Sequence, residues 1–154
     1  MSVANRLKEL GLDLPKPVAP VATYVPYVIT GNLISVSGQI PVRPDGSMPT
    51  GKVGQDLSLE EAQQVARQCG INILAQLNAA LDGDLERVKR IVRLGIFVNC
   101  VDGYGDQPKV GNGASDLMVD VFGDAGRHSR AAVGVNALPL NVPVEIDALV
   151  EISD

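Results

Sequence analysis

The stretch SLEEAQQVARQCGINILAQLNAALDG, residues 58–83, predicts one long amphipathic helix. Apolar side chains recur along it at steps of three and four, which places them on one face of a helix with 3.6 residues per turn. Ser58 and Glu61 have the spacing of a capping box, and Gly83 follows the last turn. Gly70 costs a helix about 1 kcal/mol relative to alanine, so we expect another element to pack closely against it. The apolar stripe comprises Ala62, Val65, Ala66, Cys69, Ile73, Leu77, Ala80 and Leu81.

The segments around this helix have the alternating or β-branched character of strands. The strand expected at 33–40 places Ile34 and Val36 on one face and Ser35 and Ser37 on the other. The order of elements is ββαβαββ, which predicts an α+β protein whose mixed sheet has helices on one face only. The remaining predicted elements are strands at 24–29, 85–101, 130–137 and 143–152 and a second helix at about 115–122.

The N-terminal residues differ in character from the rest of the chain. Residues 2–11 are a candidate for a short amphipathic helix, and a proline-rich stretch that cannot be helical follows them. We therefore expect an N-terminal helix and extended arm over residues 1–20 and a single domain over residues 21–154. No repeat or linker is visible within the second part.

Composition limits the classes of function. The formal net charge is −5, from 18 acidic and 13 basic side chains, and this balance opposes the clustered Lys and Arg that nucleic-acid binding requires. Aromatic residues are only 3% of the chain, with no Trp, so stacking platforms for single strands are scarce. No apolar run approaches the roughly 20 residues that cross a bilayer, and the charged N-terminus is unlike a signal peptide. We expect a cytoplasmic protein without membrane or nucleic-acid partners.

Three features of the sequence that could take part in binding or catalysis also have simple structural interpretations. Cys69 and Cys100 lack a CxxC neighbour, so we expect two core thiols rather than a metal site or a redox pair. The motif GNGAS at 111–115 could bind an anion at a helix N-terminus, but it lacks the P-loop lysine. We interpret it as a turn and an N-cap. We interpret His128, the only histidine, as a solvated or hydrogen-bonded loop residue rather than a general acid.

The last two predicted strands carry charged and small residues on the face that we expect to be free of helices. Alternation assigns Glu145 and Asp147 to this open face, and we assign Arg130, Ala132 and Gly134 to it as well. Small residues permit another surface to approach closely, so we predict that the open face packs on other subunits in a closed ring. A monomer with one solvated sheet face is the alternative. The residues assigned to the helix side of the first of these strands are Ala131, Val133 and Val135.

Two blocks of the sequence are similar to signatures of the Rid/YjgF family. SRAAVGV at 129–135, a following Leu-Pro pair and VEIDA at 144–148 resemble the C-terminal signature. YVP at 24–26, followed by GNLISVSGQ at 31–39, resembles the N-terminal signature with the same Tyr-to-Gly spacing. The resemblance covers all of the chain except the N-terminal helix and arm.

This resemblance implies a chorismate-mutase-like subunit of the bacillus type. It implies a homotrimer with its sites in clefts between neighbouring subunits. The implied activity is hydrolysis of reactive 2-imino acids, and of the 2-enamino acids from which they arise, to 2-keto acids and ammonia. The implied ligands are small 2-imino or 2-keto carboxylates. No metal or organic cofactor is required, because the electrophile is already reactive.

The resemblance also implies roles for individual residues. Arg130 would bind the substrate carboxylate, which a guanidinium fork matches bidentately. Glu145 would position the attacking water, and a carboxylate within reach of that water can act as its base. Tyr24 would line the pocket from its loop, with Ser37 beside it. The remaining implied contacts are the backbone of Gly38 and Ala132 and, in place of a family asparagine, the side chain of Asn112 or Ser115.

Other interpretations stay open from the sequence. Arg130 and Glu145, assigned to one face, also fit a plain cross-strand ion pair. The same cleft fits a non-catalytic module that senses a small carboxylate. An endoribonuclease, an activity attached to the family's name, is opposed by the acidic charge and the lone histidine. The N-terminal helix, a long loop over 102–114, and Ala132, where deaminating members often have cysteine, indicate a divergent subgroup.

Overall fold

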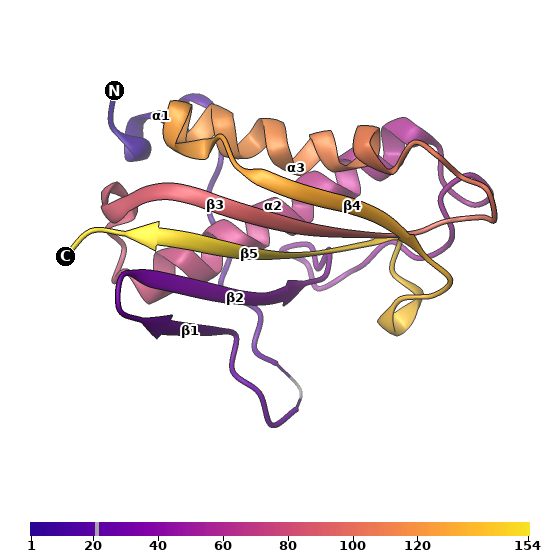
Figure 1. The fold of residues 1–154 in the computed structure, drawn as a ribbon, viewed down its shortest axis with the longest axis horizontal. Coiled ribbons are helices and arrows are strands. Elements are labelled where there is room, and N and C mark those ends of the chain that lie inside the picture. Colours follow the sequence, from indigo (N-terminus) through magenta and orange to yellow (C-terminus); the bar gives the residue numbers. More distant parts are fainter. Residues whose placement is uncertain (21) are drawn as a thin grey trace.

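The computed structural model describes residues 1–20 and 22–154. Across these residues one sheet and three α-helices follow the order α1-β1-β2-α2-β3-α3-β4-β5, so the predicted order ββαβαββ is confirmed after the N-terminal helix (Figure 1). The helices are α1 (Val3–Glu9), α2 (Leu59–Ala80) and α3 (Gln107–Phe122), with short 3-10 turns η1 (Leu85–Arg87), η2 (Gly123–Gly126) and η3 (Pro139–Asn141). The strands are β1 (Tyr27–Thr30), β2 (Leu33–Gln39), β3 (Val88–Asn99), β4 (Ser129–Val135) and β5 (Val144–Ile152).

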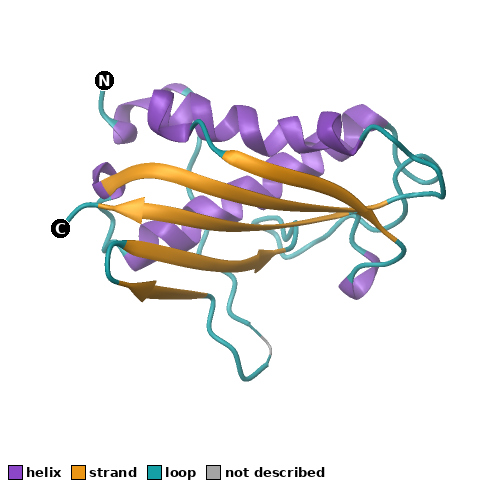
Figure 2. Ribbon diagram, in the orientation of Figure 1, coloured by secondary structure: helices purple, strands orange, loops and turns teal. Residues whose placement is uncertain are grey.

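The sheet has the order β1-β2-β5-β3-β4, so β1 and β4 form its two edges. Strands β3 and β4 run parallel, with α3 as the crossover between them, and the other neighbours are antiparallel. Helices α2 and α3 lie together on one side of the sheet, as Figure 2 shows. The prediction of an α+β fold with a mixed sheet and helices on one face is therefore confirmed.

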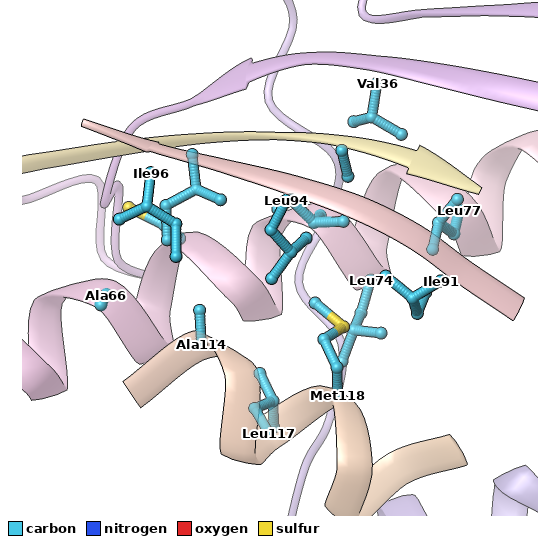
Figure 3. Packing of buried hydrophobic residues seen from close by; sticks show 14 of the residues in the cluster. Val36, Ala66, Leu74, Leu77, Ile91, Leu94, Ile96, Ala114, Leu117 and Met118 are labelled. Atoms are coloured by element: carbon cyan, nitrogen blue, oxygen red, sulfur yellow. The ribbon is translucent and has the colours of Figure 1, made fainter. Parts of the chain in front are cut away.

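One hydrophobic core fills the space between the sheet and the two long helices. Leu94 of β3 points from the sheet towards Leu74 of α2 and Met118 of α3, and all three side chains are fully buried (Figure 3). Cys69 and Cys100 are free, buried thiols, as predicted. Alternation along β5 correctly identified the residues that face this core, which are Val144, Ile146, Ala148, Val150 and Ile152.

Local signals in the sequence specify helix α2 well. The Ser58 hydroxyl accepts a hydrogen bond from the Glu61 backbone N–H at 3.2 Å, and the Glu61 carboxylate accepts one from the Ser58 N–H at 3.4 Å. This is the predicted capping box. A Cβ at Gly70 would lie 2.9 Å from Cδ2 of Leu117, so the close neighbour predicted there is α3.

Helix α3 begins at Gln107 rather than at about 115, so the interpretation of 111–115 as a turn and N-cap is wrong. Gly111 and Gly113 lie inside the helix. A Cβ at Gly111 would lie 2.8 Å from a side-chain methyl of β3, and one at Gly113 would overlap the Gln63 carbonyl of α2. The glycines therefore let α3 approach both the sheet and α2, and this packing outweighs their low helix propensity.

The face of strand β4 that points towards the helices is the opposite of the one that we predicted. Arg130 pairs with Leu94 in the parallel register, so Arg130 and Ala132 share the helix-facing side of the sheet with buried residues of β3. Val133, which we assigned to that side, is 44% exposed. A Cβ at Gly134 would lie 2.9 Å from Nε2 of Gln107, the first residue of α3. The small residues of β4 therefore accommodate the close approach of α3.

Helix α1 and the arm that follows it pack against the rest of the domain. Helix α1 buries Val3, and Leu7 and Leu10 add partly buried contacts to the core. The arm that follows α1 is tied to α2, because the buried Gln76 amide donates to the Val18 carbonyl at 2.9 Å.

None of the helices in the described part of the chain has both the length and the apolar character that a bilayer crossing requires.

Candidate functional site

A pocket of about 450 Å³ lies beside the β2–β5 pair. Four residues of the predicted site line it, namely Tyr24, Ser37, Gly38 and Glu145. A concave, mainly apolar pocket with a few convergent polar groups is the usual form of a small-molecule site. The apolar part of the lining includes Ile40, Val42, Met48, Pro139 and Leu140.

A β-bulge shapes the floor of this pocket. Between Val36 and Gln39 the register of β2 against β5 shifts, so that Ser37 and Gly38 together oppose one residue of β5. A Cβ at Gly38 would lie only 2.6 Å from Oε2 of Glu145. The glycine therefore leaves the space that the carboxylate occupies.

Two carboxyl groups share this part of the open face. Burial raises the pKa of Glu145, and the negative charge of Asp147 raises it further. Burial also raises the pKa of Asp147, although the Gly95 backbone N–H and the Arg93 charge oppose the increase. A Cβ at Gly95 would overlap Oδ1 of Asp147, so a second glycine makes room for a second carboxylate. Glu145 can therefore exchange a proton closer to neutral pH than a solvated glutamate does.

Ser37 connects the pocket floor to the segment that carries Tyr24. Its hydroxyl donates to the Val25 carbonyl at 2.7 Å, and its backbone N–H donates to the Pro26 carbonyl at 2.9 Å. The Tyr24 side chain is 55% exposed. The pocket thus has a floor held by hydrogen bonds and an aromatic rim that faces solvent.

Arg130 lies on the other side of the sheet and reaches towards α3. Its Nη1 donates to Ser115 Oγ at 2.9 Å, and its Nη2 donates to the Pro108 carbonyl at 3.0 Å. A Cβ at Gly111 would lie 3.1 Å from Nη1, so this glycine gives the guanidinium its space. The ion pairs among the described residues do not include Arg130. A half-buried guanidinium without a carboxylate partner is suited to binding an anion.

A second, shallow pocket of about 280 Å³ lies beside Arg130. It contains Asn112 and Ser115, the two candidates for the family asparagine, and it also contains His128. Ser115 Oγ lies 2.8 Å from His128 Nε2, and His128 Nδ1 lies 2.6 Å from the Gly126 carbonyl. His128 is therefore hydrogen-bonded, as predicted, and its partners link it to Arg130 through Ser115.

The predicted site residues thus form two groups on opposite faces of the sheet. Glu145 pairs with Phe97 of β3, whereas Arg130 pairs with Leu94, and alternation places these two β3 residues on different faces. The expectation that Arg130 and Glu145 face the same way is wrong, and so is the alternative of an ion pair between them within one subunit. Ala132 lies on the Arg130 side, partly buried against the core.

Sequence reasoning assigned no role to Asp147 or to the contacts of His128. For Asp147 a signal existed, because alternation places it on the same face as Glu145 and because Gly95 interrupts a strand rich in large side chains. For His128 no signal existed. Its contact with Ser115 depends on how the turn before β4 folds back onto the middle of α3.

Comparisons with known proteins agree on one family. A family model described as YjgF/chorismate mutase-like, with endoribonuclease as a supposed activity, matches residues 4–152. Protein TCP17 of Trypanosoma cruzi is 48% identical over 153 residues, which cover 99% of this chain and 95% of that protein. The crystal structure of Agrobacterium tumefaciens Atu1372, a protein of unknown function, has a TM-score of 0.90 and 49% identity and covers 98% of this chain and 94% of that one.

A more distant relative has a named activity. The 2-iminobutanoate/2-iminopropanoate deaminase of Dermatophagoides farinae is 28% identical over 142 residues, which cover 92% of this chain and 94% of that protein. These relatives are matched along nearly their whole length, so the similarity extends across the sheet and both long helices. The chain therefore belongs to the YjgF/chorismate mutase-like family.

Proposed function

We propose that this protein hydrolyses reactive 2-imino acids, formed from 2-enamino acids, to 2-keto acids and ammonia at clefts between the subunits of a homotrimer. The observation that carries the proposal is a glutamate of raised pKa, Glu145, in a mainly apolar pocket on the sheet face that α2 and α3 leave free. The similarity to a named imine deaminase supports the same chemistry.

The proposed reaction uses one carboxyl group twice. Glu145 accepts a proton from water as the water oxygen adds to the C=N carbon of the imine. It gives this proton to the imine nitrogen, which yields a carbinolamine. It then takes the proton of the carbinolamine hydroxyl and passes it to the nitrogen as the C–N bond breaks, which releases ammonia and the 2-keto acid. One imine and one water are consumed, and no redox partner is needed. A carboxyl pKa raised towards neutral favours both proton transfers.

Arg130 enters this proposal from a neighbouring subunit. Strands β1 and β4 form opposite edges of the sheet, and in a closed ring each subunit meets its neighbour through two different surfaces. We propose that the β4 edge of one subunit meets the β1–β2 edge of the next, so that Arg130 of the first binds the carboxylate of a substrate held by Glu145 of the second. Exposed apolar side chains near both edges, Val28 and Ile29 in β1 and Val133 in β4, favour such contact.

A subunit-mixing experiment tests this arrangement. Arg130→Ala and Glu145→Gln should each lower ammonia release from 2-iminobutanoate generated in situ by roughly 10²–10⁴-fold, since one loses the carboxylate anchor and the other the base. When the two variants are unfolded together and refolded in equal amounts, random assembly of trimers restores about a quarter of the sites. Light scattering should give the mass of a trimer for each variant and for the refolded mixture.

The controls separate the parts of the proposal. Glu151→Gln, a matched change on the same strand and face, should keep wild-type activity. Mixed variants that remain inactive, while each refolds to a trimer, would refute an Arg130–Glu145 site between subunits. Saturable binding of 2-ketobutyrate without turnover of the imine by the wild-type protein would instead identify a carboxylate-binding module.

A further inference from the structure

We propose that Ser115 and His128 form a second catalytic pair, which hydrolyses small carboxylic esters through an acyl-serine intermediate. This activity goes beyond the proposed imine hydrolysis and uses a different nucleophile. A serine activated by a base, with that base oriented by a third group, is the recurring arrangement of nucleophilic catalysis. In this protein the third group is the Gly126 carbonyl.

The hydrogen bonds define the tautomer of His128. A carbonyl oxygen only accepts, so the 2.6 Å contact between Nδ1 and the Gly126 carbonyl places the ring proton on Nδ1. In the neutral ring Nε2 then has a free lone pair, and the Ser115 hydroxyl 2.8 Å away donates to it. His128 is thereby arranged to take the proton of Ser115 when the serine attacks.

Arg130 completes the arrangement from the opposite side of the serine. Its Nη1 donates to Ser115 Oγ at 2.9 Å, so a fixed positive charge stabilises negative charge at that oxygen. The same guanidinium is held by the Pro108 carbonyl at 3.0 Å. A positive charge beside Oγ favours loss of the serine proton as the bond to the carbonyl carbon forms.

The pocket beside Ser115 offers room for a small ester. Its volume is about 280 Å³, and the other charged side chains that line it are Asp116 and Arg127. Arg127 also pairs with Asp124 at 3.5 Å, in an exposed contact. Three elements of the chain build the site, because Ser115 comes from the middle of α3, His128 from the turn after η2, and Arg130 from β4.

The reaction balances without any further reagent. Ser115 Oγ forms a bond to the ester carbonyl carbon, and its proton passes to His128 Nε2. The adduct expels the alcohol, which takes that proton from His128, and leaves an acyl group on Ser115. Water then attacks the acyl carbon, gives one proton to His128, and releases the carboxylic acid as the serine regains its proton.

Covalent labelling of the full-length protein tests the pair. We expect a fluorophosphonate to add one label per chain, which peptide mass spectrometry locates on Ser115, and we expect turnover of p-nitrophenyl acetate. Ser115→Ala should abolish both. His128→Ala should slow them by roughly 10²–10⁴-fold, and added imidazole should restore part of the rate, because it replaces the missing base.

A matched control is available one residue from Arg130. The exposed Ser129 hydroxyl donates to the Val92 carbonyl, outside the pocket, so Ser129→Ala should be labelled like the wild-type protein. No label on Ser115 in the wild-type protein would overturn the proposal. A His128→Ala variant that melts like the wild type and reacts at the wild-type rate would overturn it as well, leaving the hydrogen bonds as a structural tie between α3 and β4.

The ester site shares Arg130 with the proposed imine site but does not use Glu145. Glu145 lies on the opposite face of the sheet from Ser115, so Glu145→Gln should lose imine hydrolysis and keep the label on Ser115. Loss of both activities in that variant, without unfolding, would contradict a Ser115 site that works without Glu145.

Discussion

The β2–β5 pocket and the pocket beside Arg130 flank the same sheet, yet they prepare their reactive groups in opposite ways. At and beside the β2–β5 pocket, glycines in β2 and β3 leave space for Glu145 and Asp147. Partial burial raises both pKa values, and the negative charge of Asp147 raises the pKa of Glu145 further. In the pocket beside β4, donors and acceptors orient Arg130 and His128 through the shared hydroxyl of Ser115. One site gains reactivity from poor solvation, and the other gains it from orientation.

A common device nevertheless appears in both pockets. Gly38 makes room for the Glu145 carboxylate, and Gly111 makes room for the Arg130 guanidinium. Neither glycine has a positive φ, so their role is steric rather than conformational. The comparison indicates that each of these two glycines marks a neighbouring charged side chain that needs space.

The largest expected difference between the two faces of the sheet is in stability. Leu94→Ala empties a fully buried position on the helix side and should lower the free energy of unfolding by about 2–5 kcal/mol. Val133→Ala, on the open face of the neighbouring strand, should change it by less than about 0.5 kcal/mol in the isolated subunit. Urea unfolding at subunit concentrations that prevent assembly measures both. Equal losses would contradict the orientation of β4.

The two glycines provide a smaller and more local comparison. Gly38→Ala should displace the Glu145 carboxylate and lower imine hydrolysis by up to about 100-fold, because a misplacement near 1 Å can have that effect. Gly111→Ala has a looser contact with the guanidinium, so it should mainly raise KM, by about 10-fold or less, and leave kcat nearly unchanged. Steady-state kinetics separates the two. A larger loss in Gly111→Ala would show that the roles of these positions are reversed.

The smallest expected effect is a shift along the pH axis. Asp147→Asn removes the negative charge beside Glu145 and so should lower its pKa, which moves the acid limb of the pH–rate profile to lower pH. Stability should respond too. Both carboxyls titrate at higher pH in the folded protein than when unfolded, so the folded state binds more protons in that interval and its stability falls as pH rises through it. In Asp147→Asn the melting temperature should therefore fall less steeply as pH rises. An unchanged pH dependence would contradict the electrostatic coupling between Asp147 and Glu145.

Much of the fold could be predicted because local signals specify it. The capping box at Ser58, the apolar stripe of α2 and the alternation of β5 each depend on residues close together in the chain, and all were confirmed. The start of α3 could not be predicted, because Gly111 and Gly113 are poor helix formers and only the close approach of α2 and the sheet explains them. The predicted orientation of β4 was wrong because its apolar residues, Ala131, Val133 and Val135, lie on the open face of this edge strand. The small residues of the other face let α3 approach.

The sequence by itself determined the order of the elements, the core side of α2 and β5, and the family signatures that contain Arg130 and Glu145, since periodicity and spacing are properties of the chain alone. Only the tertiary structure decided that these two residues lie on opposite faces, and that Ser115, His128 and Arg130 meet in one network. The sequence of an edge strand does not fix which of its faces points towards the helices, because that depends on the elements that pack against the strand. Contacts between distant segments depend on the same packing. In this protein that neighbour is α3, whose glycines bring it against β4 and the sheet.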